Sequence, residues 1–201
     1  MSETDEVIYE RFLRDRREED LLILIGRYRE GLVLFLNGFV HDLREAEELM
    51  MDTFAEVAAG PTWFSGRSSF KTWLFSVGKN LALMQLRRSR RIVLFAEETG
   101  RDDGMPEIMA DGGRSLSEQT DSPELEILRS ELNRQIYEAI GKLKEEYRRI
   151  LILLYFEEMT HEEAGQVMRK SRRQIYHLAE RGRAALKAEM TRMGVTCEIT
   201  E

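Results

Sequence analysis

The stretch from Trp63 to Arg91, WFSGRSSFKTWLFSVGKNLALMQLRRSRR, has the apolar periodicity of an amphipathic helix. At 100° per residue its apolar side chains share one face. These are Phe70, Trp73, Leu74, Val77, Leu81 and Met84. Ser68 or Ser69 can cap the start of the helix, because a hydroxyl accepts a hydrogen bond from a free first-turn N–H. We expect the apolar face to lie in the core of a helical domain.

The same stretch is strongly basic. From Arg67 to Arg91 it holds seven basic residues and no acidic ones, in a chain whose net charge is −7. A second, mostly polar stripe can lie along a nucleic-acid strand: Thr72, Ser76, Lys79, Asn80, Leu83 and Arg87. Basic residues interleaved with aromatic rings are typical of surfaces that hold phosphates and stack bases. The alternative is a solvated basic face over aromatic core residues, but exposed helices ordinarily mix both signs of charge.

Composition limits the classes of protein that the chain can belong to. Its 201 residues, 42% hydrophobic and 33% charged, are enough for one large domain or two small ones with their own cores. The single cysteine, Cys197, excludes an internal disulfide and suits a reducing compartment. No apolar run approaches the roughly 20 residues that span a membrane, and the first residues lack the order of a signal peptide. We expect a soluble cytoplasmic protein without membrane insertion.

Charge is distributed unevenly along the chain. Residues 41–56 have a net charge of −5 and residues 93–122 a net charge of −6, whereas residues 169–192 have a net charge of +6. The pattern predicts two basic surfaces in separate halves, an acidic surface in the first half and an acidic connector between the halves.

Nearly every organised stretch has helical periodicity, which predicts an all-α protein built from two small helical domains. Helices are expected over 5–17 and 18–38, followed by one that Asp42 caps, with Glu45 placed as in a capping box. The glycine- and acid-rich residues between the halves predict a flexible linker. The expected organisation is a helical bundle over 1–95, a linker over 96–122, a second domain over 123–193 and a tail over 194–201.

The second half contains the pattern of a helix-turn-helix. Ser122 before Pro123 marks the start of its first helix. Thr160 to Glu163 form a capping box that opens a short helix, Arg169-Lys170 make a tight connection, and Ser171 caps a last helix that runs to about Arg192. The outer face of that helix is rich in basic and hydrogen-bonding side chains: Arg172, Arg173, Tyr176, His177, Glu180, Arg183 and Lys187. They cluster at its N-terminal end, which a recognition helix places in the major groove. The alternative is a solvated C-terminal helix.

The chain resembles an extracytoplasmic-function sigma factor, a compact class of bacterial promoter-specificity subunits. RYREGLVLFLNGFVHDLREAEELMMDTFAEV and FSGRSSFKTWLFSVGKNLALMQLRR are similar to region two of the family. SPELEILRSELNRQIYEAIGKL, YRRILILLYFEEMTHEEAGQVM and SRRQIYHLAERGRAAL are similar to region four. The turn Met168-Arg169-Lys170-Ser171 departs from the family, because it lacks the glycine commonly found there.

The resemblance implies a set of partners. Core RNA polymerase would bind through the clamp coiled coil of its beta-prime subunit and through its beta flap, and promoter DNA and an anti-sigma factor are further expected partners. The acidic helix after His41 would dock on the clamp. The expected polymerase contacts are Asp42, Glu45, Glu47, Glu48, Met51 and Asp52. The acidic linker would thread toward the active-site cleft and the RNA exit path.

The resemblance also implies two DNA contacts. The first domain would read and melt the minus-ten element through Phe64, Arg67, Lys71, Ser76, Lys79, Asn80, Arg87 and Arg88. The second would read the minus-thirty-five element through Ser171, Arg172, Arg173, Gln174, Tyr176, His177, Arg181 and Arg183. Two interpretations of Phe64 stay open, a ring that packs a flipped base or a core residue, and Asn80 either bonds a base edge or is merely solvated.

Two other classes of function are alternatives to the sigma factor. A helix-turn-helix regulator could bind duplex DNA alone and use residues 1–92 for an effector or for dimerisation. A nucleic-acid-processing enzyme would need a catalytic constellation, and the carboxylates here lie on solvated helix faces. His41, His161 and His177 are isolated, with no Cys or His at metal-ligand spacing, so we expect neither a metal nor a cofactor. The acidic helix beside the basic aromatic helix favours the sigma factor.

Overall fold

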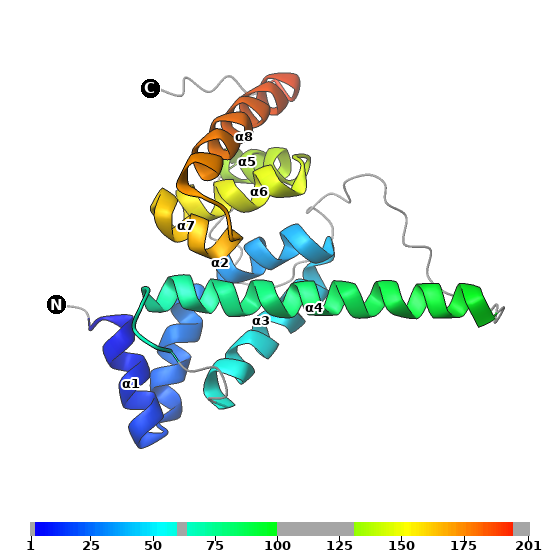
Figure 1. Cartoon of the computed structure of the whole chain (residues 1–201). Coiled ribbons are helices and arrows are strands. Elements are labelled where there is room, and N and C mark those ends of the chain that lie inside the picture. The colour runs from blue at the N-terminus through cyan, green and yellow to red at the C-terminus, as the bar shows by residue number, and fades with distance from the viewer. Residues whose placement is uncertain (1–2, 60–63, 100–130, 195–201) are drawn as a thin grey trace.

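The structure is a computed structural model that describes residues 3–59, 64–99 and 131–194, with side chains described for 3–59, 64–89 and 135–194. Every regular element in these ranges is helical, which confirms the prediction of an all-α fold (Figure 1). Among the described helices, none combines the length and the apolar character that a bilayer crossing requires.

The first domain is a bundle of four helices. They are α1 (Asp5–Asp15), α2 (Glu18–Val40), α3 (Leu43–Ala59) and α4 (Phe70–Thr99). Their core is made largely of aromatic and aliphatic side chains that are almost fully buried. Its largest members are Ile8, Tyr9, Leu24, Leu32, Phe35, Leu36, Phe54, Phe70, Leu74 and Phe75. The Tyr9 hydroxyl donates to the carbonyl of Val57 at 3.0 Å and ties α1 to the end of α3.

Local caps set the starts of two of these helices. The Asp42 carboxylate accepts from the amides of Arg44 and Glu45 at 2.8 and 3.1 Å, as predicted for the start of α3. Of the two serines considered for α4, it is Ser69 whose hydroxyl accepts from the Thr72 amide, at 3.3 Å. These bonds satisfy N–H groups that have no partner within the first helical turn.

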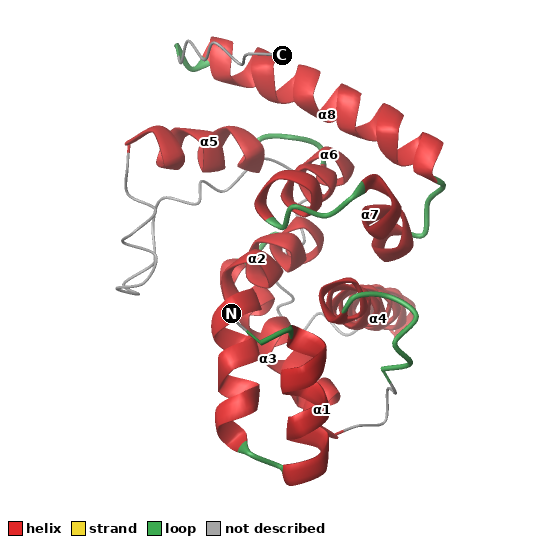
Figure 2. Ribbon diagram, turned by 90° about the vertical axis from the view of Figure 1, so that its left-hand side faces the viewer, coloured by secondary structure: helices red, strands yellow, loops and turns green. Residues whose placement is uncertain are grey.

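Over residues 131–194, the part that the structure describes, the second domain consists of four α-helices and one π-helical turn. They are α5 (Glu131–Gly141), α6 (Glu145–Leu151), the π-helix η2 (Ile152–Phe156), α7 (His161–Met168) and α8 (Arg172–Arg192). Figure 2 shows α8 lying across α6, with α7 beside its N-terminal end. Helix α6 ends at Leu151, and the chain continues in π geometry from Ile152 to Phe156, so the two together are not one regular α-helix.

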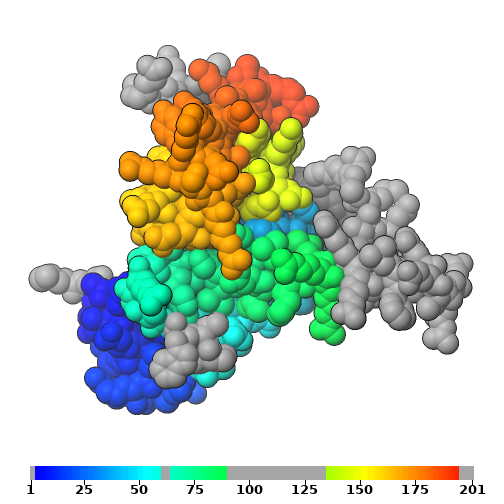
Figure 3. Space-filling view, in the orientation of Figure 1, coloured from blue at the N-terminus to red at the C-terminus, as the bar shows by residue number. Residues whose placement is uncertain are grey.

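The two domains pack directly on each other, which the sequence pattern did not predict. Helix α7 lies on α4, and α6 and η2 lie on α2 (Figures 1 and 3). Buried apolar residues from both domains form one continuous core cluster. The fold is therefore two helical units joined by an extensive interface.

Two expectations about the faces of α4 are corrected. Met84, placed on the apolar face, is 63% exposed. Thr72 and Lys79, placed on the polar stripe, are only 1% and 8% exposed, and the Lys79 ammonium donates to the Val167 carbonyl of the second domain. Helix α4 ends at Thr99.

Other expectations lie outside the described residues. These are the Ser122–Pro123 helix start, the linker from residue 100 onward, and the tail that contains Cys197.

Candidate functional surfaces

The helix-turn-helix is built by two capping boxes. Thr160 accepts from the Glu163 amide at 3.2 Å while the Glu163 carboxylate accepts from the Thr160 amide at 2.9 Å. Ser171 and Gln174 make the same reciprocal pair at 3.3 and 2.8 Å. Arg169 connects the two helices in the left-handed region, with φ of 55°, where glycine is usual. The predicted short helix, tight connection and capped last helix are thus confirmed.

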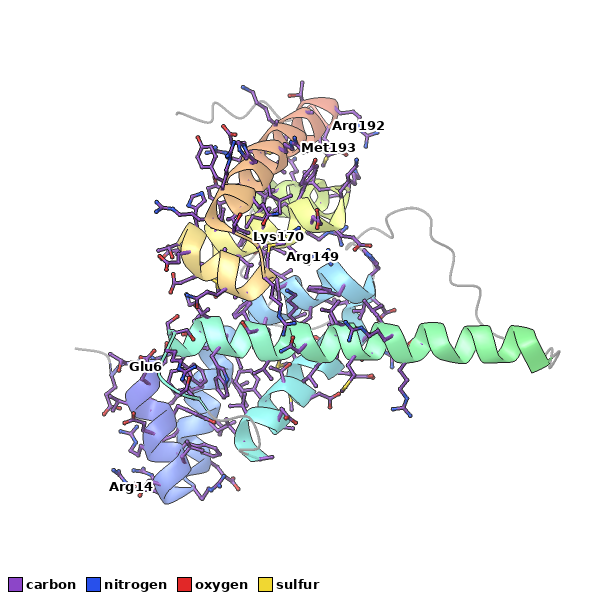
Figure 4. The ribbon with its side chains drawn as sticks, in the orientation of Figure 1. Glu6, Arg14, Arg149, Lys170, Arg192 and Met193 are labelled. Carbon is purple, nitrogen blue, oxygen red and sulfur yellow. The ribbon has the colours of Figure 1, made fainter. Side chains whose placement is uncertain are left out.

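Helix α8 separates an apolar face from a basic one. Ile175, Ala179 and Gly182 are buried on the side of α8 that packs on the rest of the second domain. A Cβ at Gly182 would lie 3.4 Å from Leu151. The predicted contact residues on the other side are all exposed: Ser171, Arg172, Arg173, Gln174, Tyr176, His177, Arg181 and Arg183. In Figure 4 this side of α8 carries side chains that point away from the protein.

Two members of this set have structural contacts of their own. The Gln174 amide oxygen belongs to the capping box, so this side chain is held at the helix start. The Tyr176 ring lies between the rings of His161 and His177, with centroids 6.1 and 5.8 Å away. His161 was not predicted as a site residue, and its position one helix earlier gave no sequence signal for this contact.

A groove of about 610 Å³ lies between α2 and α3. Its lining residues are Ile25, Arg29, Arg44, Glu47, Glu48, Met50, Met51 and Asp52. The structure thus brings together four of the six predicted polymerase contacts, and Met51 is 56% exposed at the groove. Asp42 and Glu45 lie at the start of α3, outside the groove lining.

The groove contains cations and apolar groups that sequence analysis did not assign to it. Arg29 and Arg44 line the groove together with the acidic residues, and Ile25 adds an apolar side chain from α2. In the sequence, Ile25 and Arg29 are one helical turn apart and therefore share one face of the helix. This spacing is the signal that could have placed them on one surface. Near the groove, burial and then the neighbouring carboxylates of Asp42 and Glu48 raise the pKa of Glu45.

The predicted strand-contact residues of the first domain divide into two groups. Arg67, Asn80, Arg87 and Arg88 are exposed. Lys71 and Lys79 instead donate to backbone carbonyls of the second domain, those of Glu157 at 2.7 Å and Val167 at 2.9 Å. Ser76 donates to the Thr72 carbonyl on its own helix at 2.8 Å.

Phe64 lies in an aromatic cluster. Its ring centroid is 5.3 Å from that of Trp73 and 6.1 Å from those of Tyr9 and Phe70. The side chain is half-buried. This placement agrees with the interpretation of Phe64 as a core residue, and the exposed part of the ring is the part that could meet a base.

Two of the histidines contact acidic side chains. His41 contacts Glu145 at 2.9 Å across the domain interface, and His177 lies 3.6 Å from Glu180 on α8. Within the described ranges, no group of three or more His, Cys, Asp or Glu side chains is placed to hold a metal ion.

Comparison with known proteins matches both halves of the chain. Residues 24–92 match the family model of sigma-70 region 2, and residues 133–186 match that of sigma-70 region 4. The RNA polymerase sigma-H factor of Pseudomonas aeruginosa is 31% identical over 83% of this chain and 83% of its own length. The chain belongs to the extracytoplasmic-function sigma factors. As a sigma factor, it binds core RNA polymerase and directs promoter recognition, DNA melting and transcription initiation.

More distant relatives agree with this assignment. The sigma factor SigW of Bacillus subtilis is 23% identical over 83% of this sigma factor and 87% of its own length. Among solved structures, CnrH in complex with the cytosolic domain of CnrY superimposes with a TM-score of 0.59 at 18% identity, covering 94% of this chain and 99% of that one. RpoE in complex with the anti-sigma factor NepR, from Bartonella quintana, gives a TM-score of 0.58 at 21% identity, covering 87% and 96%. These two likenesses concern the fold.

Proposed function

We propose that the two domains divide promoter recognition between them. Residues 1–95 bind core polymerase and the minus-ten element, residues 123–193 bind the minus-thirty-five element, and residues 96–122 link them. The observation that supports this division most directly is the separation of the surfaces: an exposed basic face on α8 in one domain, and a mixed acidic and apolar groove in the other.

The minus-thirty-five element is assigned to the N-terminal end of α8. Arg172, Arg173, Tyr176 and His177 are exposed there, at the end of the helix that enters the major groove in helix-turn-helix proteins. Arginine can bond guanine in bidentate fashion, and the tyrosine and histidine can reach phosphates or base edges. Arg181 and Arg183, farther along the helix, are placed to meet the phosphate backbone.

The minus-ten element is assigned to α4 and the loop before it. Arg67, Arg87 and Arg88 supply exposed cations for the strand backbone, and Asn80 supplies an amide for a base edge. Phe64 offers the exposed part of its ring to an unstacked base. Lys71 and Lys79 join this set once the second domain no longer holds them.

The groove between α2 and α3 is assigned to the polymerase. Glu47, Glu48 and Asp52 give it acidic character, and Met51, which is 56% exposed, gives an apolar surface that a partner helix can bury. Charge complementarity would orient a basic partner before the apolar contact forms.

Three further parts of the proposal concern the cellular setting. The protein acts in the cytoplasm, where core polymerase is found, and it contributes binding and not catalysis, because the polymerase supplies the chemistry. An anti-sigma factor controls it; the support is that RpoE, a structural relative, was solved in complex with one.

Run-off transcription with core polymerase, with and without this protein, tests the proposal. We expect transcripts from a subset of promoters only when the protein is present. Reversing Glu48 and Asp52 to lysine should weaken capture of core polymerase, whereas the same reversal at Glu10 and Asp15, on α1 and away from the groove, should not. Equal capture by both variants would contradict the groove assignment, and transcription without core polymerase dependence would contradict the function.

A further inference from the structure

Helix α1 contacts both ends of the loop that precedes α4. We call residues 64–69 the capture loop, because they include Phe64 and Arg67, which are assigned to the minus-ten strand. The contacts come from Glu6 and Tyr9 of α1. These two residues are three positions apart in the helix, so they lie on the same face. One face of α1 thus reaches both the beginning and the end of the capture loop.

Glu6 holds the end of the capture loop, where α4 begins. Its carboxylate accepts from the Phe70 amide at 2.9 Å, and Phe70 is the first residue of α4. An amide in the first turn has no partner within its own helix, and a negative charge is favourable at a helix N-terminus. Glu6, labelled in Figure 4, lies where α1 meets the start of α4. A side chain from another helix therefore fixes the start of α4.

Tyr9 holds the beginning of the capture loop. Its ring packs edge-to-face with that of Phe64, with centroids 6.1 Å apart, and lies 5.4 Å from that of Trp73. Tyr9 is itself fixed, because it is 1% exposed and its hydroxyl donates to the Val57 carbonyl of α3 at 3.0 Å. A buried and hydrogen-bonded ring gives Phe64 a rigid surface to pack on.

Between these two anchors the capture loop turns and is open to solvent. Gly66 has a φ of 68°, in the left-handed region that glycine adopts without strain. Ser65, Gly66 and Arg67 are exposed. The loop therefore has fixed ends and an exposed middle, and binding residues on such a loop depend on the rigid elements that position it.

We propose that Glu6 and Tyr9 are positioning residues for strand capture, which hold the two ends of the capture loop so that the exposed part of the Phe64 ring faces an unstacked base. The inference rests on the proposed role of Phe64 in binding the minus-ten strand. It extends that role to α1, which ends at Asp15, before residue 24, where the match to sigma-70 region 2 begins.

The physical basis is preorganisation of the loop. A capture loop with free ends would sample many conformations, and its affinity for a base would be reduced by the fraction of time in which Phe64 is presented. The Glu6 hydrogen bond and the Tyr9 packing restrict those conformations before the strand arrives. A loop that is already ordered loses less conformational entropy when it binds.

Open-complex formation by the holoenzyme, at saturating core polymerase and on a promoter that run-off transcription has identified, tests the inference. Glu6→Ala removes the acceptor of the Phe70 amide and should slow open-complex formation by about three- to tenfold, because part of the base–aromatic stacking is lost. Glu6→Gln keeps an oxygen acceptor and should stay within about twofold of the unmodified protein. Glu10→Ala is the matched control and should have no effect, because Glu10 is exposed one turn further along α1.

A double-mutant cycle distinguishes positioning from a purely structural role. Phe64→Ala alone should slow open-complex formation by at least about tenfold. If Glu6 acts through Phe64, adding Glu6→Ala to the Phe64→Ala protein should cause no further slowing, because the ring that it positions is already gone. Two effects that multiply would show that Glu6 acts elsewhere and would overturn its positioning role.

Hydrogen exchange measures the Glu6 contact without any activity. In the free protein, the Phe70 amide should exchange at least about tenfold faster in Glu6→Ala than in the unmodified protein, because a hydrogen bond to a charged acceptor is lost. Glu6→Gln should keep most of the protection. Equal exchange in all three proteins would overturn the anchoring of α4 by Glu6.

A second variant tests the other anchor. Tyr9→Phe keeps the ring beside Phe64 and removes the hydroxyl that bonds to Val57. Open-complex formation should slow by about two- to fivefold, because one hydrogen bond that fixes the ring is lost. The slowing should again disappear in the Phe64→Ala background, and its persistence there would overturn the positioning role of Tyr9.

The possible outcomes separate the inference from the proposed function. Normal open-complex formation by Phe64→Ala would overturn the proposed role of Phe64 and the inference with it. A slow Phe64→Ala protein together with a normal Glu6→Ala protein would overturn the inference alone. On a promoter opened beforehand by a mismatched bubble, Glu6→Ala should recover. Equal slowing on the bubble and the duplex would place its effect in folding or polymerase docking, and would also overturn the inference.

Discussion

Arg173 lies in the first turn of α8 and is exposed. If its guanidinium makes a bidentate contact with a guanine of the upstream element, Arg173→Ala should lose about 1–3 kcal/mol of discrimination at that base pair. We expect roughly 5- to 150-fold less preference between matched and mismatched promoters in run-off transcription. Lys187→Ala, exposed nearer the other end of the same helix, is the control and should keep the preference. An unchanged preference in the Arg173 variant would count against this residue.

Lys79 should make the free energy of unfolding depend on pH in the alkaline range. Burial, followed by the nearby cations Arg169, Arg149 and Lys170, lowers the pKa of Lys79 to about 8, from 10.5 for a free lysine. Between these values the unfolded chain binds more protons than the folded one, so stability rises with pH. The stability contributed by neutral, buried Lys79 is fully present above pH 10.5. It is lost as the pH falls to 8 and below, because the folded protein must then bury a charged lysine.

The measurement is urea unfolding of the unmodified protein and of Lys79→Met across pH 7.5–10.5. The free energy of unfolding of the unmodified protein should rise relative to the variant, by at most about 3 kcal/mol. Comparison with the variant removes the effect of other titrating groups that both proteins share. Parallel curves would show that Lys79 is not held in this buried position.

Capping provides a test at the scale of single elements. Thr160 accepts from the Glu163 amide to start α7, so Thr160→Ala should destabilise the second domain by about 1 kcal/mol. Thr4 is the N-cap residue of α1, but its side chain makes no capping hydrogen bond. Thr4→Ala is therefore a matched control with little expected effect. Thermal unfolding followed by circular dichroism would measure both. A larger loss for Thr4→Ala would contradict the capping account.

The helices also differ in how closely their buried faces match the faces that the sequence periodicity predicts. Helix α8 shows the apolar and basic faces that its periodicity predicts, since Ile175 and Ala179 are buried while Arg172 and Arg173 are exposed. Helix α4 does not, because two neighbours cover it from different sides: α3 and the rest of the first domain on one, and α7 on the other. A helix in contact on two sides has no single buried stripe.

At the scale of the whole molecule, the interface should make unfolding cooperative. The apolar core runs without interruption through both domains, and small proteins with one core commonly unfold in a single transition. We expect one transition by calorimetry for the unmodified protein. A Cβ at Gly31 would meet Glu157 and a Cβ at Gly38 would meet Arg149, both in the second domain, whereas a Cβ at Gly26 would meet nothing within 4 Å. Replacing Gly31 and Gly38 by leucine should therefore split the transition into two, one for each domain, whereas Gly26→Leu should not. Two transitions in the unmodified protein would mean that the domains unfold independently.

Much of the fold was determined by the sequence alone. Helix periodicity predicted an all-α chain, and the caps at Asp42, Thr160 and Ser171 lie where the structure has helix starts. These features depend on hydrogen bonds and side-chain faces within a few residues of each other, so they can be inferred without knowing what the helix packs against. The exposed candidates on α8 follow from the same local rule.

Only the tertiary structure decided which polar residues are free. In sequence, Lys79 and Arg87 belong to the same stripe, yet Lys79 is bonded to Val167, 88 positions away, while Arg87 is exposed. Gly31 and Gly38 carried no pattern of their own, and their role depends on Glu157 and Arg149 in the other domain. A polar stripe has the same sequence whether it faces water or a second domain, because docking is decided by shape and by contacts between distant parts of the chain.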